Sequence, residues 1–430
     1  MLADGLAARR SALEVLRDVL ERRQPLDQAL ARSRSFAVLP VRDRAFVRLI
    51  VTTLLRRLGQ IDAVLGRCLD RPLPPRAATV RDVLRIGAVQ LLFLRVPPHA
   101  AVSTSVSLLG GRQAAYRALV NAVLRRLARE GAALLAATDA EPVNLPAWLW
   151  RSWTTAYGEP ATRAIARVLM TEPPLDISAK SERETWARRL DARLLPTGTL
   201  RRDDVGLVSE LPGYSEGEWW VQDAAAAIPA RLFGNIRDET VVDLCAAPGG
   251  KTAQLAAAGA HVIAVDRSEP RLARLKQNLA RLRLDATVVT ADAVMWRPPA
   301  PVRFVLLDAP CSATGTLRRH PEALWRKSPE DVARLTPLQD RLLDAAVEML
   351  APGGVLVYVT CSLQPEEGPE RISALLARSR QVVRRAIHAG EVAGLADLIT
   401  SDGDLRTLPC HLADLGGVDG FYAARLVRTA

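Results

Sequence analysis

The stretch Asp243-Leu-Cys-Ala-Ala-Pro-Gly-Gly-Lys-Thr252 decides the fold class of the C-terminal half of this chain. It ends a short apolar run and leads into a segment with helical periodicity. Gly249 and Gly250 allow a tight turn in which a ligand can approach the backbone, and the start of the next helix would face that ligand. A strand, a glycine turn and a helix in this order predict one unit of an α/β sheet, although such a turn is weak evidence by itself.

Four more apolar runs follow the first, and helical stretches separate several of them. The runs occupy residues 241–247, 261–266, 286–289, 304–307 and 355–359. Continuous β-branched runs that alternate with helices predict a mostly parallel sheet covered on both faces. Ligands of such sheets bind beyond the carboxyl ends of the strands, so the residues that end each run are the candidates for a site.

Carboxylates end the second and third runs. Asp266 lies 17 residues beyond Gly249, where it can accept hydrogen bonds from two ribose hydroxyls, and Asp292 follows the third run. Either aspartate alone could be a helix cap, but carboxylates on successive strands favour a nucleoside cofactor. The turn has neither the glycine spacing of dinucleotide sites nor that of phosphate loops, which disfavours NAD and ATP. S-adenosylmethionine fits the pattern better.

Two cysteines follow the last two runs, in Asp308-Ala-Pro-Cys311 and in Thr360-Cys-Ser362. A buried cysteine is often only a small apolar residue, but two of them at the carboxyl ends of strands favour nucleophilic chemistry. The C5 atom of cytosine is a poor nucleophile, and a thiolate that adds at C6 makes it reactive toward an activated methyl group. The pair of cysteines therefore indicates the formation of 5-methylcytosine.

Several blocks together are highly specific, namely 243–252, 308–315 with Arg318-Arg-His-Pro321, and 360–367. In these blocks the chain resembles the bacterial 16S ribosomal RNA cytosine-5 methyltransferases of the Sun/Fmu type, within the NOL1/NOP2/Sun family. The resemblance implies that Cys361 is the nucleophile, that Cys311 assists product release, and that Asp308 and Lys251 also take part in catalysis. The cofactor-binding set that it implies is Cys245, Ala246, Ala247, Pro248, Gly249, Gly250, Lys251, Asp266, Asp292 and Asp308.

The N-terminal third has helical apolar spacing from residue 8 to about residue 136, which predicts an all-helical domain. Three of its segments, at 39–46, 81–88 and 119–125, resemble the NusB-like RNA-binding domain. Residues 1–134 contain 23 arginines and no lysine against 10 acidic residues, a net charge of +13 that leaves −2 for the rest. A charged helical surface can be merely solvated, but an excess of planar guanidinium groups suits phosphate, so RNA is the expected partner.

We expect three parts in the chain. These are a NusB-like helical domain at 1–136, a small α+β connecting module at 137–235 with a helix around 182–195, and a Rossmann-like methyltransferase domain at 236–430. No apolar stretch supplies the ~20 uncharged residues of a membrane span, and the N-terminus shows no signal segment. The five cysteines have neither disulfide-framework nor zinc-ligand spacing. A cytoplasmic monomer without a metal is therefore expected.

Alternative functions remain open at this point. The same chemistry on transfer RNA would use the same motifs as 16S ribosomal RNA. An RNA-binding assembly or antitermination factor with a vestigial methyltransferase domain is disfavoured, because Lys251, Asp308, Cys311 and Cys361 are all present. Methylation of an exocyclic amino group needs no thiolate and typically shows Asp-Pro-Pro-Tyr or Asn-Pro-Pro-Tyr after the fourth strand, where this chain has Asp-Ala-Pro-Cys.

Overall fold

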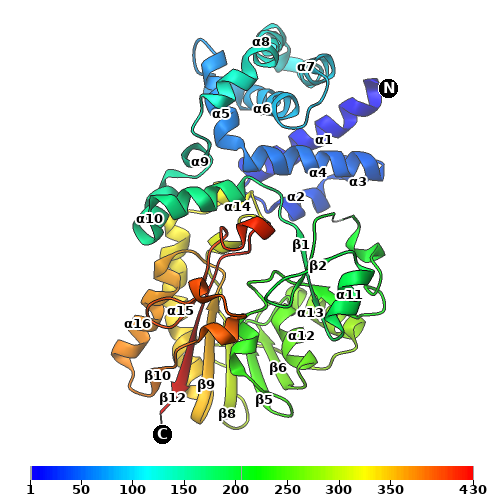
Figure 1. Ribbon diagram of the computed structural model, residues 1–430. Helices are drawn as coiled ribbons and strands as arrows, with labels where there is room; N and C mark the ends of the chain where they lie inside the picture. The colour runs from blue at the N-terminus through cyan, green and yellow to red at the C-terminus, as the bar shows by residue number, and fades with distance from the viewer. Residues whose placement is uncertain (1, 205, 430) are drawn as a thin grey trace. The chain divides into compact units, whose positions relative to one another are not determined.

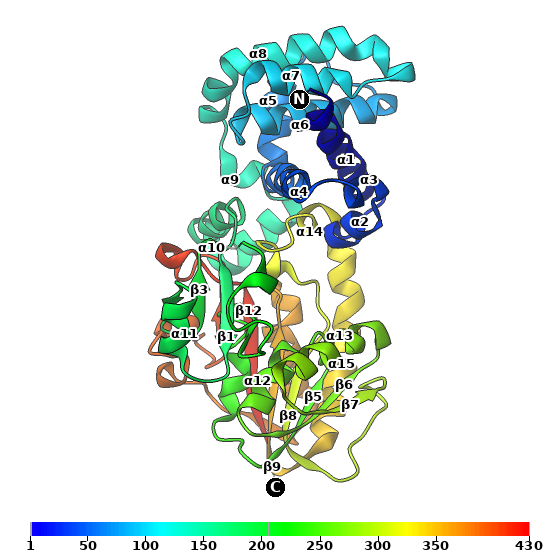
Figure 2. The same ribbon diagram turned by 90° about the vertical axis from the view of Figure 1, so that its right-hand side faces the viewer.

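The computed structural model describes residues 2–204 and 206–429, which form two compact units (Figure 1, Figure 2). Unit 1 contains the chain up to Thr171 together with the distant segment Leu317–Lys327. Unit 2 contains Glu172–Thr316 and the chain from Ser328 onward. The predicted combination of an all-helical domain with a Rossmann-like sheet domain is confirmed.

Unit 1 is built of helices whose apolar residues recur every three or four positions. On α4, residues Val47, Ile50, Val51, Leu54 and Leu55 are all fully buried, and each such burial stabilises the fold by about 1.5–3 kcal/mol. The helices of this unit are α1 (Leu2–Leu20), α2 (Leu26–Arg32), α3 (Arg34–Ala37), α4 (Val41–Arg56), α5 (Leu58–Cys68), α6 (Ala78–Leu92), α7 (Pro98–Ser107), α8 (Arg117–Ala136), α9 (Ala140–Val143), α10 (Ala147–Leu169) and α14 (Ala323–Arg326).

The segment Leu317–Lys327 completes unit 1, and its helix α14 lies beside α2 and α4 in both views (Figure 1, Figure 2). The Trp325 indole Nε1 donates a hydrogen bond to the Leu55 carbonyl at 2.8 Å. The Arg56 guanidinium donates to the Arg318 carbonyl at 2.5 Å. The segment Leu317–Lys327, although distant in the sequence, therefore packs against the N-terminal helices.

Unit 2 begins with a small antiparallel sheet in the order β2-β3-β1-β4. A fully buried ion pair anchors it, because the Arg201 guanidinium donates to both carboxylate oxygens of Asp176 at 2.7 and 2.6 Å. The helix expected around 182–195 is shorter than predicted and ends at Arg189, since the chain then turns and pairs as strand β2. The elements are β1 (Leu175–Ala179), α11 (Arg183–Arg189), β2 (Arg193–Leu194), β3 (Leu200–Arg202) and β4 (Trp219–Val221).

The large sheet of unit 2 has the strand order β10-β12-β9-β8-β5-β6-β7, with β11 paired to β12. The strands from β7 to β9 are parallel, and β12 runs antiparallel beside β9. All five predicted runs are strands of this sheet, at positions within a few residues of those expected. The strands are β5 (Thr240–Leu244), β6 (His261–Asp266), β7 (Thr287–Thr290), β8 (Val302–Asp308), β9 (Leu350–Thr360), β10 (Val382–Arg384), β11 (Leu405–Thr407) and β12 (Phe421–Arg428).

Helices cover both faces of the large sheet, α12 and α13 on one side and α15 and α16 on the other (Figure 1). Alternate residues of each strand enter different cores, as the period of a strand requires. Leu356 and Tyr358 of β9 pack with α15 and α16, whereas Val357 and Val359 belong to the opposite core. The helices are α12 (Gly250–Ala257), α13 (Glu269–Leu282), α15 (Pro329–Met349) and α16 (Pro369–Arg378).

Across the described part of the chain, none of the helices is both long enough and apolar enough to cross a membrane.

Candidate active site

The carboxyl ends of the parallel strands meet at one edge of the large sheet, because their pairing aligns these ends. Asp308 at the end of β8 lies opposite Val359 of β9, and Asp266 at the end of β6 lies opposite Thr290 of β7. The loops that leave these strands carry the residues predicted for the site. A compact site is therefore produced by strand register and not by neighbouring positions in the sequence.

The glycine turn between β5 and α12 has the tight backbone that the sequence predicted. Gly249 has φ of 101°, and a Cβ atom there would lie 2.7 Å from the Leu275 Cγ atom. Cys245, at the start of the turn, also has positive φ, at 60°, and burial raises the pKa of its thiol to about 12. A thiol with this pKa stays protonated at neutral pH, so Cys245 contributes to the turn as a packed backbone position and not as a nucleophile.

Asp266 holds the turn against the end of β6. One carboxylate oxygen accepts from the Ala247 backbone N–H at 3.2 Å, and the other accepts from the Ser268 N–H at 2.8 Å. The side chain is 3% exposed. Asp292 differs, because it is exposed and its carboxylate accepts from the Val294 N–H in its own turn at 3.0 Å. Both carboxylates follow strands at the same edge, as predicted.

Lys251 and Asp308 form an ion pair at the centre of this edge. The Lys251 Nζ atom is 2.8 Å from the Asp308 carboxylate and 5.0 Å from the centre of the Phe421 ring. Burial lowers the pKa of Lys251, but the charge of Asp308 and its hydrogen bond more than offset this, and the pKa is raised. A fixed ammonium group therefore lies beside a carboxylate that remains 31% exposed.

The two predicted cysteines are brought together, with 3.5 Å between the Cys311 and Cys361 sulfur atoms. They come from the turns that follow β8 and β9. The Gly315 backbone fixes these turns to each other, because its N–H donates to the Cys361 carbonyl at 2.9 Å and its carbonyl accepts from the Gly420 N–H at 2.8 Å. A Cβ atom on Gly315 would lie 1.8 Å from the Gly420 carbonyl oxygen, so only glycine fits.

The electrostatic surroundings of the two thiols differ. The hydrogen bond with Cys361, burial and the negative charge of Glu367 raise the pKa of the Cys311 thiol well above its ordinary value. Cys361, in contrast, interacts electrostatically with the Lys251 ammonium group. The surroundings of Cys311 therefore disfavour its thiolate form.

Three polar residues of the site received no role from the sequence. Ser312 and Ser362 directly follow the two cysteines, and Glu367 accepts hydrogen bonds from both hydroxyl groups. All three are fully buried. All three lie inside the sequence blocks 308–315 and 360–367, and two of them directly follow the cysteines, so the sequence offered a reason to consider them. It could not show that their side chains contact one another.

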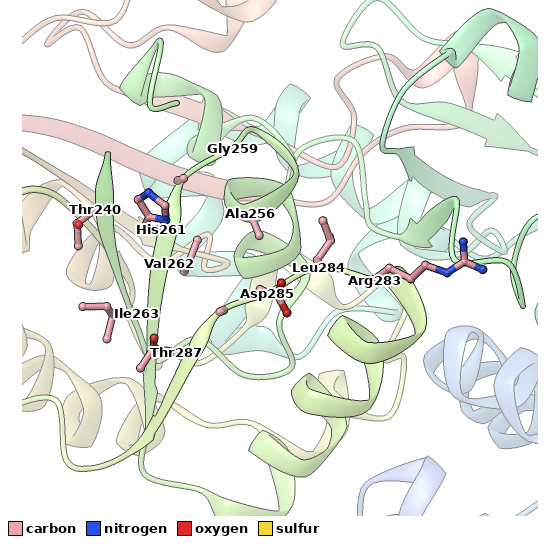
Figure 3. Close-up of a pocket in the computed structure, with 12 residues that line it drawn as sticks. Thr240, Ala256, Gly259, His261, Val262, Ile263, Arg283, Leu284, Asp285 and Thr287 are labelled. Carbon is pink, nitrogen blue, oxygen red and sulfur yellow. The ribbon is translucent and has the colours of Figure 1, made fainter. Parts of the chain in front are cut away.

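A hollow of about 680 Å³ lies at the opposite edge of the sheet, where β5, β6 and β7 begin (Figure 3). Thr240, His261 and Thr287, the first residues of these strands, line it together with Arg283 and Asp285. These five side chains are exposed. The hollow is thus separated from the cysteine pair by the length of the strands, and it is not the site that the sequence predicted.

Comparisons with known proteins show the family to which the chain belongs. Residues 232–427 match the family described as 16S rRNA methyltransferase RsmB/F, and residues 6–129 match the NusB family. Proteins called ribosomal RNA small subunit methyltransferase B are similar to the chain. The one from Cronobacter sakazakii is 32% identical over 94% of this chain and 97% of its own length, and the one from Pseudomonas syringae pv. tomato is 35% identical over 91% and 90%.

The solved structure of the protein PH0851 has the same fold, with a TM-score of 0.73, 22% identity and coverage of 98% of both chains. Fold and site together define a Rossmann-like methyltransferase with a NusB-like domain. The chain belongs to the 16S rRNA methyltransferase RsmB/F family. It is an S-adenosylmethionine-dependent methyltransferase that forms 5-methylcytosine in ribosomal RNA, as the sequence predicted.

Proposed function

We propose that this protein methylates C5 of one cytosine in 16S ribosomal RNA through a covalent bond between the Cys361 sulfur and C6. The observation that carries the proposal is the 3.5 Å separation of Cys311 and Cys361 at the carboxyl ends of adjacent parallel strands. The Lys251–Asp308 ion pair lies at the same edge. A thiol pair placed this way suits a reaction in which one sulfur adds to the base and the other acts after methyl transfer.

We propose that S-adenosylmethionine binds along this edge and supplies the activated methyl group. The residues fit a nucleoside cofactor, because the turn from Cys245 to Lys251 carries no side chain at Gly249 and Gly250. Asp266 and Asp292 follow β6 and β7, in the order that a ribose and a base would need. Asp308 would lie between the cofactor and the cytosine.

The residues of the chain have separate tasks in the proposed reaction. The Cys361 thiolate forms a bond to C6, which moves an electron pair to C5. C5 would then take the methyl group as the bond between that group and the cofactor sulfur breaks, which leaves S-adenosylhomocysteine. The Lys251 ammonium group interacts electrostatically with Cys361. The C5 proton then leaves, the C6–sulfur bond breaks, and its electron pair returns to Cys361 as the double bond re-forms.

We assign the later steps to Cys311. Its sulfur lies 3.5 Å from the Cys361 sulfur, close enough to assist removal of the C5 proton or expulsion of the Cys361 sulfur after methyl transfer. Asp308, 31% exposed and hydrogen-bonded to Lys251, is placed to accept a hydrogen bond from the exocyclic amino group of the base. The assignment of Cys361 as nucleophile and Cys311 as the residue for product release is the one that the family resemblance implies.

We further propose that the NusB-like part, residues 1–136, binds RNA in the cytoplasm and that 137–235 connects it to the catalytic part at 236–430. These three boundaries stay a prediction. The net charge of +13 on residues 1–134 supports the first role. A monomer is sufficient for the proposed reaction, since Lys251, Asp308, Cys311 and Cys361 all come from one chain.

A trapping experiment distinguishes the proposed roles of the two cysteines. Cys361→Ala removes the nucleophile, so we expect neither methylation nor a covalent RNA adduct. Cys311→Ala forms the thioether, transfers the methyl group and then stalls, so we expect a persistent protein–RNA band. Denaturing gels with labelled RNA and S-adenosylmethionine measure both outcomes.

Cys68→Ala is the matched control, because Cys68 is buried in the helical unit and is expected to leave the gel pattern unchanged. A band with Cys361→Ala and none with Cys311→Ala would reverse the two roles. Full activity of both variants without trapping would remove the covalent mechanism.

The RNA substrate is tested in cells. Bisulfite sequencing of total RNA with and without this gene should show one cytosine of 16S ribosomal RNA that loses its mark. Loss of a mark in transfer RNA instead would retain the chemistry and change the substrate.

A further inference from the structure

We infer that the buried carboxylate of Glu367 is a positioning residue that holds the two cysteine-bearing turns in register. Glu367 ends the short 3-10 turn Pro365–Glu367, six residues after Cys361. The inference rests on the proposed function, because it concerns the same two thiols. It adds a residue to which the sequence and the comparisons give no role.

The hydrogen bonds of Glu367 reach both turns. One carboxylate oxygen accepts from the Ser312 N–H at 2.8 Å. The other accepts from the Ser312 hydroxyl at 2.5 Å and from the Ser362 hydroxyl at 2.6 Å. Each serine directly follows a cysteine of the pair, Cys311 or Cys361. Only one peptide unit separates each serine from its cysteine. A shift of the Glu367 carboxylate would therefore displace the sulfur atoms of both Cys311 and Cys361.

The position of Glu367 is itself fixed from two other elements. The Gln339 side chain, on α15, donates to a Glu367 carboxylate oxygen at 3.2 Å and to the Pro310 carbonyl at 2.9 Å. The Tyr358 hydroxyl, on β9, donates to the Glu367 backbone carbonyl at 2.8 Å. The carboxylate thus connects a helix and a strand to the two turns.

The donors to the Glu367 carboxylate named above are neutral hydroxyl and amide groups, while the side chain is 0% exposed. A buried carboxylate that accepts from several fixed donors holds those donors in one orientation. In a Glu367→Gln variant the new NH₂ group would face either both serine hydroxyls, which would have to turn, or the Ser312 N–H and the Gln339 amide. The register of the turns would then depend on the remaining contacts, among them the Thr314 hydroxyl 3.2 Å from Ser362.

A positioning role for Glu367 affects the rate of catalysis, whereas a purely stabilising role affects only the stability of the fold. Catalysis between two sulfur atoms and a base is sensitive to small displacements, and a misplacement of 1 Å can lower a rate by about 10²-fold. Cofactor binding depends on the turn after β5 and on Asp266, which do not contact Glu367. Loss of register should therefore lower kcat and leave the affinity for S-adenosylmethionine unchanged.

The test compares Glu367→Gln with Glu370→Gln in the full-length protein. Glu370 is exposed in the first turn of α16, three residues further on, so its substitution makes the same chemical change outside the cluster. For Glu367→Gln we expect a fall in kcat of about 10²-fold, a KM for RNA within about threefold and unchanged calorimetric affinity for S-adenosylmethionine. For Glu370→Gln we expect wild-type values.

Phenylarsine oxide gives a second measurement that does not need RNA. Its arsenic atom binds two thiols at once and loses its oxygen as water, so its affinity reports whether Cys311 and Cys361 are within bridging reach. We expect Glu367→Gln to bind it at least about tenfold more weakly than wild type, and Cys311→Ser to lose the bridged complex.

Wild-type kcat and wild-type phenylarsine affinity in a folded Glu367→Gln variant would overturn the inference. If that variant does not fold, Ser362→Ala decides, because it removes one donor to the carboxylate, and unchanged values on both measurements would again overturn the inference. Failure of the proposed function is recognised separately, since Cys311→Ala would then trap no RNA while the arsenical affinity of the wild-type protein stayed measurable.

Discussion

The Asp243 carboxyl lies beneath the glycine turn, where burial raises its pKa from 3.8 to about 7, while a hydrogen bond from the Thr252 hydroxyl opposes the rise. Between these two pH values the unfolded chain has lost this proton and the folded chain retains it. The free energy of unfolding therefore falls as pH rises from about 4 to about 7.

Asp243→Asn removes this titration. We expect the melting temperature of the variant, relative to wild type, to increase as pH rises from 4.5 to 7 and to change little above pH 8. Thermal unfolding followed across this pH range measures the difference. A difference that stays constant with pH would show that the Asp243 carboxyl is already charged in the folded protein at low pH.

Individual site residues were predictable to different degrees. The residues at the ends of strands, such as Asp266, Cys311 and Cys361, could be recognised because the topology of a parallel sheet gathers strand ends. Glu367 could not be recognised, since it comes from a turn and its hydrogen bonds go to Ser312 and Ser362, the residues that follow the cysteines. Contacts between buried polar side chains depend on rotamers and packing, which have no period in a sequence.

The turn between β5 and α12 offers a comparison of two neighbouring glycines. Gly249 has positive φ, and a Cβ atom there would meet the Leu275 side chain at 2.7 Å. Gly250 begins the helix, and a Cβ atom there would have the Gln222 side chain at an ordinary 3.9 Å. The two positions therefore differ in steric demand although they are identical in sequence.

We expect Gly249→Ala to lower the free energy of unfolding by about 1–3 kcal/mol, because it combines backbone strain with a close contact. Gly250→Ala should stay within about 0.5 kcal/mol of wild type, or be slightly stabilising, since alanine favours a helix. Denaturant unfolding without cofactor measures both. Equal effects of the two substitutions would mean that the turn relaxes around either side chain.

Elements with a strong period were predicted well, and irregular ones were not. The strands β5, β6, β7, β8 and β9 lie where their apolar runs predicted them. Helix α11 ends at Arg189, short of the predicted 195, because pairing of β2 with β3 competes with the helix. The residues of β3 lie beyond the helix in the sequence. The periodicity of residues 182–195 therefore could not predict that pairing with β3 would end the helix early.

At the scale of the whole molecule, the arginine excess predicts how RNA binding depends on salt. Arg34, Arg42 and Arg112 are exposed on the helical unit. If they contact phosphates, the triple change to glutamine should weaken RNA binding and reduce the slope of log K against log salt by roughly 0.7–0.9 per lost contact. Affinity measurements at several salt concentrations give the slope.

A matched triple variant in unit 2, Arg274→Gln, Arg303→Gln and Arg380→Gln, makes the same change in charge at exposed positions. We expect it to alter the slope less. Equal reductions of the salt slope in the two triple variants would show that RNA binding depends on net charge alone. The helical unit would then have no special part in binding.

The membership of Leu317–Lys327 in unit 1 has a consequence for the order in which a newly made chain can fold. Synthesis runs from the N-terminus, so at ~5–20 residues per second the roughly 145 residues between Thr171 and Leu317 take about 7–30 s to appear. During this time the Leu55 carbonyl has not yet met the Trp325 indole that donates to it in the folded protein. The first helices to leave the ribosome are therefore among the last to complete their packing, and they must wait, accessible to chaperones and proteases, until most of the catalytic unit has been translated.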